Sequence, residues 1–206
     1  MSTIVINTFV TLDGVAQAPG GPEEDRTGGF ELGGWTVPLF TEQVGALIGP
    51  WHTGAGALLL GRRTYDIFAS HWPKVPADHE EAPMAEILTS TPKFVASRGS
   101  ASLDWENSTQ LAGDLPTAVA ELKEQDLGEI QVLGSLDLAQ TLIRHDLIDE
   151  YRLAVFPVVL GSGKRLFGDG AIPSGLELVS TQATDSGVVG MVYRRSGKPT
   201  FGSFML

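Results

Sequence analysis

The sequence predicts an α/β protein in which helices alternate with the strands of a layered sheet that ends in an antiparallel pair. Short apolar runs rich in β-branched residues alternate along the 206 residues with segments of helical periodicity. The last two such runs, residues 176–184 and 187–196, are separated only by a short turn, which is typical of antiparallel strands. No linker of different composition divides the chain, so we expect one domain over residues 1–198 and a C-terminal tail over residues 199–206.

The N-terminal part begins with a strand and a long loop. Residues 4–12 are rich in β-branched side chains and predict the first strand. Residues 13–37 are rich in glycine and predict a loop. A loop of this length inside a compact domain more often has a function than serves only as a connection. Pro38 suits the first turn of a helix that we expect to run to about Trp51.

The rest of the chain continues the alternation. Apolar runs predict strands at residues 57–60, 93–97, 130–133 and 150–160. Helices are predicted at residues 62–68, 82–90, 114–125 and 135–145. Asp114 is the expected N-cap of its helix, in which Val119 and Leu122 should face the core.

Composition excludes several classes of protein. Hydrophobic residues make up 42% of the chain and charged residues 19%, which is a globular and not a disordered composition. The absence of cysteine excludes a disulfide scaffold, a thiolate nucleophile and a zinc ribbon. A net charge of −11 argues against a nucleic-acid partner, and no apolar run approaches the ~20 residues of a membrane helix. Met1 leads almost directly into the first predicted strand, so we expect a cytoplasmic protein.

Three strand-to-helix corners share one plan, in which an apolar strand is followed by Gly or Ser and a helix start. They are "ALLLGRRT" (57–64), "FVASRG" (94–99) and "IQVLGSLDL" (130–138). Unpaired N–H groups and the positive end of the helix dipole favour anions at such a corner. A single corner is explained as well by a tight turn and a capped helix. Three corners together, two of them with arginines in an acidic chain, favour a dinucleotide.

Standard motifs of other sites are imperfect or absent. "GAGALLLG" (54–61) has Leu59 where a dinucleotide fingerprint needs its third glycine, and "VVLGSGKR" (158–165) has Arg165 where a P-loop needs Ser or Thr. We expect no metal, because the histidines show no metal-ligand spacing: His52, His71, His79 and His145. The run "EEDR" (23–26) is expected to be a set of solvated loop charges.

Six segments, three of which overlap the corners above, occur in a specific order: "TLDG" (11–14), "LLLGRRTYD" (58–66), "KFVASR" (93–98), "VLGSLDLAQTLI" (132–143), "LIDEYRL" (147–153) and "FPVVLGSGKRLF" (156–167). Together they resemble the dihydrofolate reductase superfamily, and more closely the reductase domain of the bifunctional riboflavin-biosynthesis deaminase–reductase and its stand-alone relatives. The resemblance implies NADPH on a three-layer α/β/α fold with a mixed, mostly parallel central sheet. No deaminase motif of the form HxE…PCxxC precedes it, so a free-standing reductase is expected.

The resemblance assigns three groups of residues to the cofactor. The segment along the cofactor phosphates matches Gly61, Arg62, Arg63 and Thr64. The turn that meets the adenosine 2′-phosphate matches Ser97 and Arg98. The pyrophosphate turn before a helix matches Gly134, Ser135, Leu136, Asp137 and Leu138. Dihydrofolate reductases have two glycines joined by a cis peptide at this turn, whereas Ser135 here replaces the second glycine.

Other positions bear on catalysis. Folate reductases carry an acid on the first long helix, and Phe40 stands in its place, so dihydrofolate is expected to be a poor substrate. Asp13 in "TLDG" is shared with the riboflavin-type reductases, and we expect it to face the cleft as the polar catalytic group. An equally good explanation is that Asp13 only closes a turn with Gly14. Lys164 is expected either at a phosphate or in solvent.

The leading hypothesis is hydride transfer from NADPH to a small heterocyclic substrate. The substrate would be a pyrimidine like 5-amino-6-(5-phosphoribosylamino)uracil or a pterin-like compound. The alternatives are a non-catalytic protein that binds NADPH or another small ligand, and a purely structural oligomer. The apolar strand at residues 150–160 predicts a homodimer, and the resemblance implies the same, because members of the family commonly form dimers. Residues 13–35 are expected to close over the nicotinamide.

Overall fold

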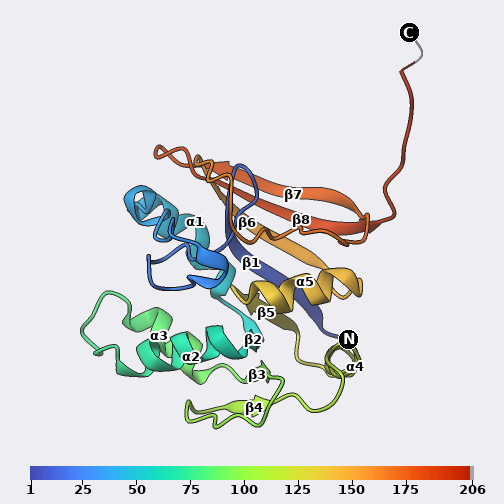
Figure 1. Ribbon diagram of the computed structural model, residues 1–206. Coiled ribbons are helices and arrows are strands. Elements are labelled where there is room, and N and C mark those ends of the chain that lie inside the picture. The colour runs from blue at the N-terminus through green and yellow to red at the C-terminus, as the bar shows by residue number, and fades with distance from the viewer. Residues whose placement is uncertain (205–206) are drawn as a thin grey trace.

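One mixed sheet of eight strands runs through the computed structural model, which describes residues 1–204 (Figure 1). The strands are β1 (Thr3–Thr11), β2 (Ala55–Gly61), β3 (Lys93–Ala96), β4 (Ser108–Gln110), β5 (Glu129–Leu133), β6 (Glu150–Phe156), β7 (Gly175–Ala183) and β8 (Val189–Gly197). Their order in the sheet is β4-β3-β2-β5-β1-β6-β8-β7. The pairings from β4 to β6 are parallel, whereas β8 is antiparallel to both β6 and β7. The predicted antiparallel pair at the C-terminal end is confirmed.

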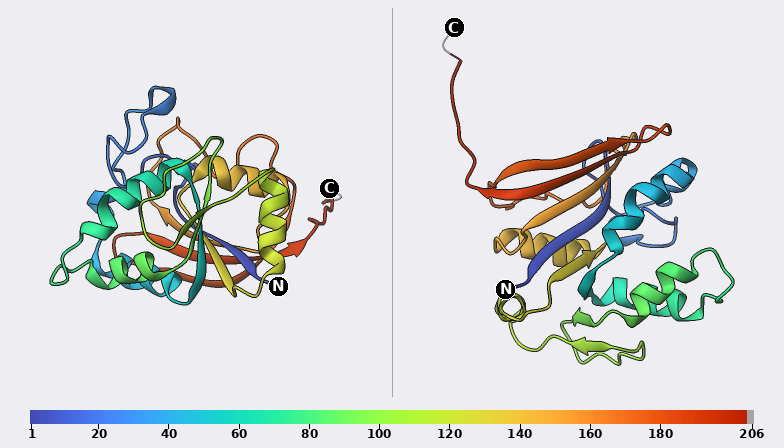
Figure 2. Two further views of the ribbon diagram at one scale, coloured as in Figure 1. Left: turned by 90° about the horizontal axis from the view of Figure 1, so that it is seen from below. Right: turned by 180° about the vertical axis from the view of Figure 1, so that it is seen from behind.

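Helices cover both faces of this sheet and so make three layers (Figures 1 and 2). One face carries α1 (Glu42–His52), α2 (Arg62–His71) and α3 (Ala82–Ser90), and the other carries α4 (Leu115–Glu124) and α5 (Leu136–Arg144). Short 3₁₀ helices lie in the connections: η1 (Thr27–Gly29), η2 (Val37–Leu39) and η3 (Trp72–Lys74). The predicted α/β/α fold with a mixed, mostly parallel sheet is confirmed.

The central strand β1 separates two parts of the core. Ile4 and Ile6 pack in one cluster with Leu122 of α4 and Leu142 of α5. Phe9, on the opposite face, packs against the cluster that includes α1. A parallel strand covered by helices on both faces is largely buried, and β1 is rich in apolar and β-branched side chains, although Asn7 and Thr8 are buried polar residues within it.

Two elements differ from the expectation. The sequence gives no signal for β4, because Ser108–Gln110 is polar and pairs only with β3 at the edge of the sheet. The helix expected from Pro38 begins instead at Glu42, after the short helix η2. Thr41 is its N-cap, with a hydroxyl that accepts a hydrogen bond from the Val44 N–H at 3.4 Å.

The strand predicted at residues 150–160 is shorter and more central than expected. It ends at Phe156, because Pro157 has no N–H to continue the ladder. β6 lies between β1 and β8, and the side chains of Tyr151, Leu153 and Phe156 are buried inside the chain. Most apolar side chains of β6 thus already have partners within the chain, whereas Val159, beyond its end, is 68% exposed, and the expected homodimer stays a prediction.

The C-terminal segment leaves the sheet. Residues 199–204 contain neither helix nor strand, and their trace runs away from the body of the molecule (Figure 1). The last two residues of the expected tail, 205–206, lie outside the described residues. Of the helices that the structure describes, none is long and apolar enough to cross a membrane.

A fully buried lysine links α3 to the sheet. Lys93 at the start of β3 is 1% exposed, and its Nζ donates to the carbonyl oxygens of Leu88 (2.8 Å), Thr89 (2.8 Å) and Thr91 (2.7 Å). The same nitrogen lies 4.2 Å from the ring centroid of Trp105. Burial lowers the pKa of Lys93 to about 8, which still leaves the ammonium charged at neutral pH. Lys93 thus caps the C-terminal carbonyls of α3.

Replacing this lysine should destabilise the protein. Lys93→Met removes the donor of three hydrogen bonds and leaves the carbonyls of Leu88 and Thr91 without this partner, which should lower the free energy of unfolding by about 2–3 kcal/mol. Chemical denaturation measures the change. Lys198→Met, at an exposed lysine, is the matched control and should change stability by no more than about 0.5 kcal/mol. Equal stability of the two variants would contradict the capping role.

Candidate functional site

A cleft of about 2210 Å³ opens where β2, β3 and β5 end. Ligands of open α/β sheets bind at these carboxyl ends. Every residue that the sequence assigns to the cofactor lines this cleft: Gly61, Arg62, Arg63, Thr64, Ser97, Arg98, Gly134, Ser135, Leu136, Asp137 and Leu138. The residues come from three corners that are distant in sequence. The sheet brings the corners together because β3, β2 and β5 are neighbours.

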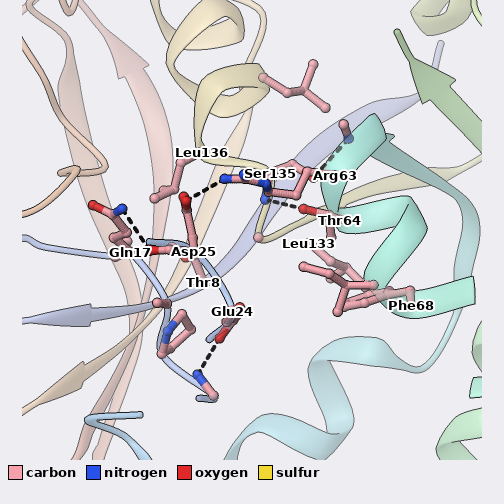
Figure 3. Close-up of a pocket in the computed structure, with 18 of the residues that line it drawn as sticks. Thr8, Gln17, Glu24, Asp25, Arg63, Thr64, Phe68, Leu133, Ser135 and Leu136 are labelled. Carbon is pink, nitrogen blue, oxygen red and sulfur yellow. Dashed lines mark hydrogen bonds and ion pairs between the residues drawn. The ribbon is translucent and has the colours of Figure 1, made fainter. Parts of the chain in front are cut away.

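The corner after β5 has an unusual backbone. Gly134 and Ser135 both have a φ of 53°, in the left-handed region that favours glycine. The Gly61 N–H donates to Ser135 Oγ at 2.9 Å, and the Ser135 N–H donates to Thr64 Oγ1 at 3.1 Å (Figure 3). No peptide bond within residues 1–204 is cis, and this includes the bond between Gly134 and Ser135. The two hydrogen bonds tie this corner to the neighbouring corner after β2.

Both corners present free backbone donors. The N–H groups of Leu136, Asp137 and Leu138 in the first turn of α5 have no acceptor in the described chain; the first paired one is that of Ala139, which donates to Ser135 O at 2.8 Å. The first three N–H groups of α2, at residues 62–64, are equally without an acceptor among the described residues. Two helix N-termini therefore line one cleft with unpaired donors, an arrangement that fits a pyrophosphate.

The charged residues of the cleft differ in how they are paired. Arg62 Nε lies 2.8 Å from a carboxylate oxygen of Asp66 on the same helix. Arg98, in the turn after β3, has no carboxylate partner in the part of the chain that the structure describes. Arg98 is also exposed, so its guanidinium is available to an anionic ligand.

Asp25 joins two of these cations across the cleft. Its carboxylate forms an ion pair with Arg63 at the start of α2 (Figure 3). It forms another with Lys164, at 3.0 Å. Burial favours protonation, but hydrogen bonds from Thr27 and the contact with Lys164 outweigh it and lower the pKa of Asp25 to about 2. The expectation that the charges of residues 23–26 are all solvated is wrong for Asp25. It ties the long loop to α2 and to the segment after β6, through contacts that no sequence pattern predicts.

Glu24 is a second acid that the sequence reasoning missed. It lines the cleft, and its carboxylate accepts a hydrogen bond from the Gly20 N–H at 2.7 Å (Figure 3). Burial raises the pKa of Glu24, and the nearby charge of Asp25 acts in the same direction. Glu24 is thus an acid that keeps its proton to higher pH than an exposed glutamate does.

Asp13 does not lie where the sequence predicts. It is not among the residues that line the cleft. Its carboxylate accepts hydrogen bonds from Thr11 Oγ1 (2.6 Å), the Gly161 N–H (2.8 Å) and the Leu160 N–H (3.2 Å). The bond from Thr11 and those from the backbone outweigh burial and lower the pKa of Asp13 to about 2. The expectation that Asp13 faces the cleft is wrong, since its carboxylate binds the segment after β6 to the end of β1.

The part of the cleft beside α1 has a different character. Phe40 lines it and packs edge to face on Phe9, with ring centroids 6.3 Å apart. Gly45 and Gly49 of α1 also line it, and no other protein atom lies within 4 Å of the place where a Cβ would stand on either. Glycine inside a helix costs about 1 kcal/mol relative to alanine. Packing within the described chain requires neither glycine.

The chain has the dihydrofolate reductase-like fold: an open sheet is covered on both faces, and a cleft lined by two helix N-termini lies at its strand ends. The chain belongs to the RibD C-terminal domain family, whose sequence model matches residues 2–190. This reductase-like family accounts for the resemblance found in the sequence.

Individual proteins are also similar to this chain. The chain is 29% identical over 194 residues to the uncharacterized protein YyaP of Bacillus subtilis (strain 168), covering 94% of this chain and 95% of the relative. A protein of Shewanella sp. PV-4 assigned to riboflavin biosynthesis has the same fold, with a TM-score of 0.64, 20% identity and coverage of 95% and 99%. A pyrimidine reductase-like protein of Corynebacterium diphtheriae matches with a TM-score of 0.57, 13% identity and coverage of 94% and 92%.

The left-handed corner can be tested with two variants of one residue. Ser135→Ala removes the acceptor of the Gly61 N–H and keeps a side chain in the left-handed region, so it should lower the free energy of unfolding by about 1 kcal/mol or more. Ser135→Gly loses the same hydrogen bond but relieves the backbone, and should be about 1 kcal/mol more stable than the alanine variant. Chemical denaturation compares them. An alanine variant as stable as the glycine variant would contradict the observed conformation.

Proposed function

We propose that the protein is an NADPH-dependent reductase that transfers hydride to a small heterocyclic substrate, with chemistry of the riboflavin-biosynthesis type. The observation that carries the proposal is the convergence of two free helix N-termini and one unpaired arginine in a cleft that continues into an apolar space beside α1. Membership of the RibD C-terminal domain family supports the same chemistry.

The cofactor contacts follow from the donors in the cleft. The N–H groups of Leu136, Asp137 and Leu138 would bind the pyrophosphate, and Ser97 and Arg98 would bind the 2′-phosphate that distinguishes NADPH from NADH. NADPH, when bound, supplies the hydride and leaves as NADP⁺. The chain holds the reactants together and excludes water with the loop that Asp25 ties down.

Reduction also consumes one proton, and we assign its source to Glu24. The substrate gains one hydride and one proton, so the net reaction is NADPH, substrate and H⁺ to NADP⁺ and the dihydro product. Glu24 lines the cleft, and burial raises its pKa toward the range in which a carboxyl group can act as a general acid. Asp13 is not proposed for this role, because its carboxylate points to the backbone of residues 160–161.

The alternative function is a non-catalytic protein that binds NADPH or a related ligand in the same cleft. Two observations favour it: Phe40 stands where folate reductases have their acid, and Asp13 lies outside the cleft. Only the reductase would turn over a substrate. Turnover is measured as the loss of NADPH absorbance in the presence of candidate substrates.

The expected homodimer stays a prediction, but we now place its contact surface on β7 instead of β6. β7 is the edge strand of the sheet beyond β8, and its apolar side chains Leu176, Leu178 and Val179 are exposed. We propose this edge as the contact in place of β6.

The cofactor assignment can be tested at Arg98. Arg98→Ala removes a charge-assisted hydrogen bond of ~1.5–3 kcal/mol and should weaken NADPH binding by about a factor of ten or more, with NADH affinity nearly unchanged. Titration of both cofactors into both proteins measures this. Arg144→Ala, an exposed arginine that does not line the cleft, is the control and should bind both cofactors normally. Equal affinity of the unaltered protein for NADH and NADPH would refute the role of this corner.

The proton source can be tested separately. Glu24→Gln keeps the shape of the side chain and removes the proton, so the catalytic rate should fall by about 10²–10⁴ while the affinity for NADPH stays the same. The neighbouring Glu23 is exposed and does not line the cleft, so Glu23→Gln is the matched control. If both variants turn over substrate at the same rate, Glu24 is not the proton source.

A further inference from the structure

We propose that the substrate is an uncharged, largely apolar ring compound, without phosphate or carboxylate, bound in the part of the cleft between α1 and the pair α2 and α3. This inference rests on the proposed reductase function and narrows its substrate. We name this part of the cleft the ring chamber. It is bounded on the α1 side by Phe40, Ile48 and Trp51, and on the other side by Phe68, Trp72 and Met84.

The walls of the ring chamber suit a flat apolar ligand. Four of the six bounding side chains are aromatic, and aromatic faces and edges bind planar rings through dispersion and stacking. Phe68 stands beside Leu133 at the end of β5, where the ring chamber meets the cofactor corners (Figure 3). A ring bound there would lie next to the cofactor, as hydride transfer requires.

Most cations of the cleft are already paired with a carboxylate of the chain: Arg62 with Asp66, and Arg63 and Lys164 with Asp25. The lysine and arginine side chains that line the cleft are Arg62, Arg63, Arg98 and Lys164. They come from the start of α2, the turn after β3 and the segment after β6, and among the described lining residues none comes from α1 or α3. A phosphate in the ring chamber would therefore find no cation on α1 or α3, and Arg62 and Arg63 of α2 would have to leave Asp66 and Asp25 to reach it.

Other ionisable groups of the cleft also disfavour an anion. Glu80 and Glu81, just before α3, line the cleft and would repel a phosphate or carboxylate. His52 at the end of α1 lines it too, but burial lowers its pKa, so the imidazole is uncharged at neutral pH. An uncharged ligand avoids both the missing cation and the repulsion.

The glycines of α1 point to close contact with a ligand. Gly45 and Gly49 lie one turn apart, and the space above both is free of other protein atoms within 4 Å. A helix keeps glycine at a cost in stability, and the described packing gives no reason for it here. A ring lying against the helix backbone does give a reason, because a methyl group at either position would occupy its place.

The test measures binding to the NADP⁺-saturated protein, so that no turnover is needed. Calorimetry with lumazine and menadione, two uncharged rings, is compared with 5-amino-6-(5-phosphoribosylamino)uracil and dihydrofolate. At least one uncharged ring should bind about tenfold or more tightly than either anionic compound. Tighter binding of an anionic compound, or no binding of the uncharged rings, overturns the inference. Binding of an uncharged ring without NADPH oxidation supports the inference but contradicts the reductase function.

A matched pair of variants tests the location. Gly49→Ala should raise Tm by about 2–4 °C, weaken binding of the uncharged ring about tenfold and leave NADPH affinity unchanged. Gly21→Ala, also with free space at its Cβ but outside the cleft lining, should leave ring binding unchanged. Unchanged ring affinity in Gly49→Ala overturns the location, even if the protein becomes more stable. A loss of NADPH binding in the same variant also counts against it.

Discussion

The site depends on one constraint, which is that two neighbouring parallel strands end beside each other and must both start a helix there. β2 and β5 are hydrogen-bonded neighbours, so the N-termini of α2 and α5 are forced into the same space. The left-handed backbone at Gly134 and Ser135 makes this possible, and Ser135 exchanges hydrogen bonds with Gly61 and Thr64. The unpaired donors of both helix starts then line one cleft, and this arrangement is the basis of the proposed phosphate binding.

Around this constraint, the cleft divides into a charged part and an apolar part. The charged part contains the arginines and Lys164, and Asp25 holds two of these cations while it anchors the long loop. The apolar part lies beside α1 and contains aromatic side chains and glycines. In a protein of net charge −11, this division is the basis of the proposal that a phosphate-bearing cofactor binds in one part and a different kind of ligand in the other.

Much of the fold follows from local sequence, because buried parallel strands and amphipathic helices leave periodic patterns. The corners at Gly61 and Gly134 were predictable in the same way, since a strand, a small residue and a helix start are contiguous. What local sequence could not show were contacts between distant segments. Asp25 meets residues 38 and 139 positions away, and β4 is a strand only because β3 offers it an edge. Asp13 was misplaced because its partners, Leu160 and Gly161, are equally remote.

The central claim is that the first turn of α5 binds the pyrophosphate of NADPH. A crystal structure of the protein with NADPH tests it directly. The account predicts pyrophosphate oxygens within hydrogen-bond distance of the N–H groups of Leu136, Asp137 and Leu138, with the adenosine 2′-phosphate beside Arg98. Density for NADPH elsewhere in the molecule, or a first turn of α5 free of ligand at saturating NADPH, would contradict it.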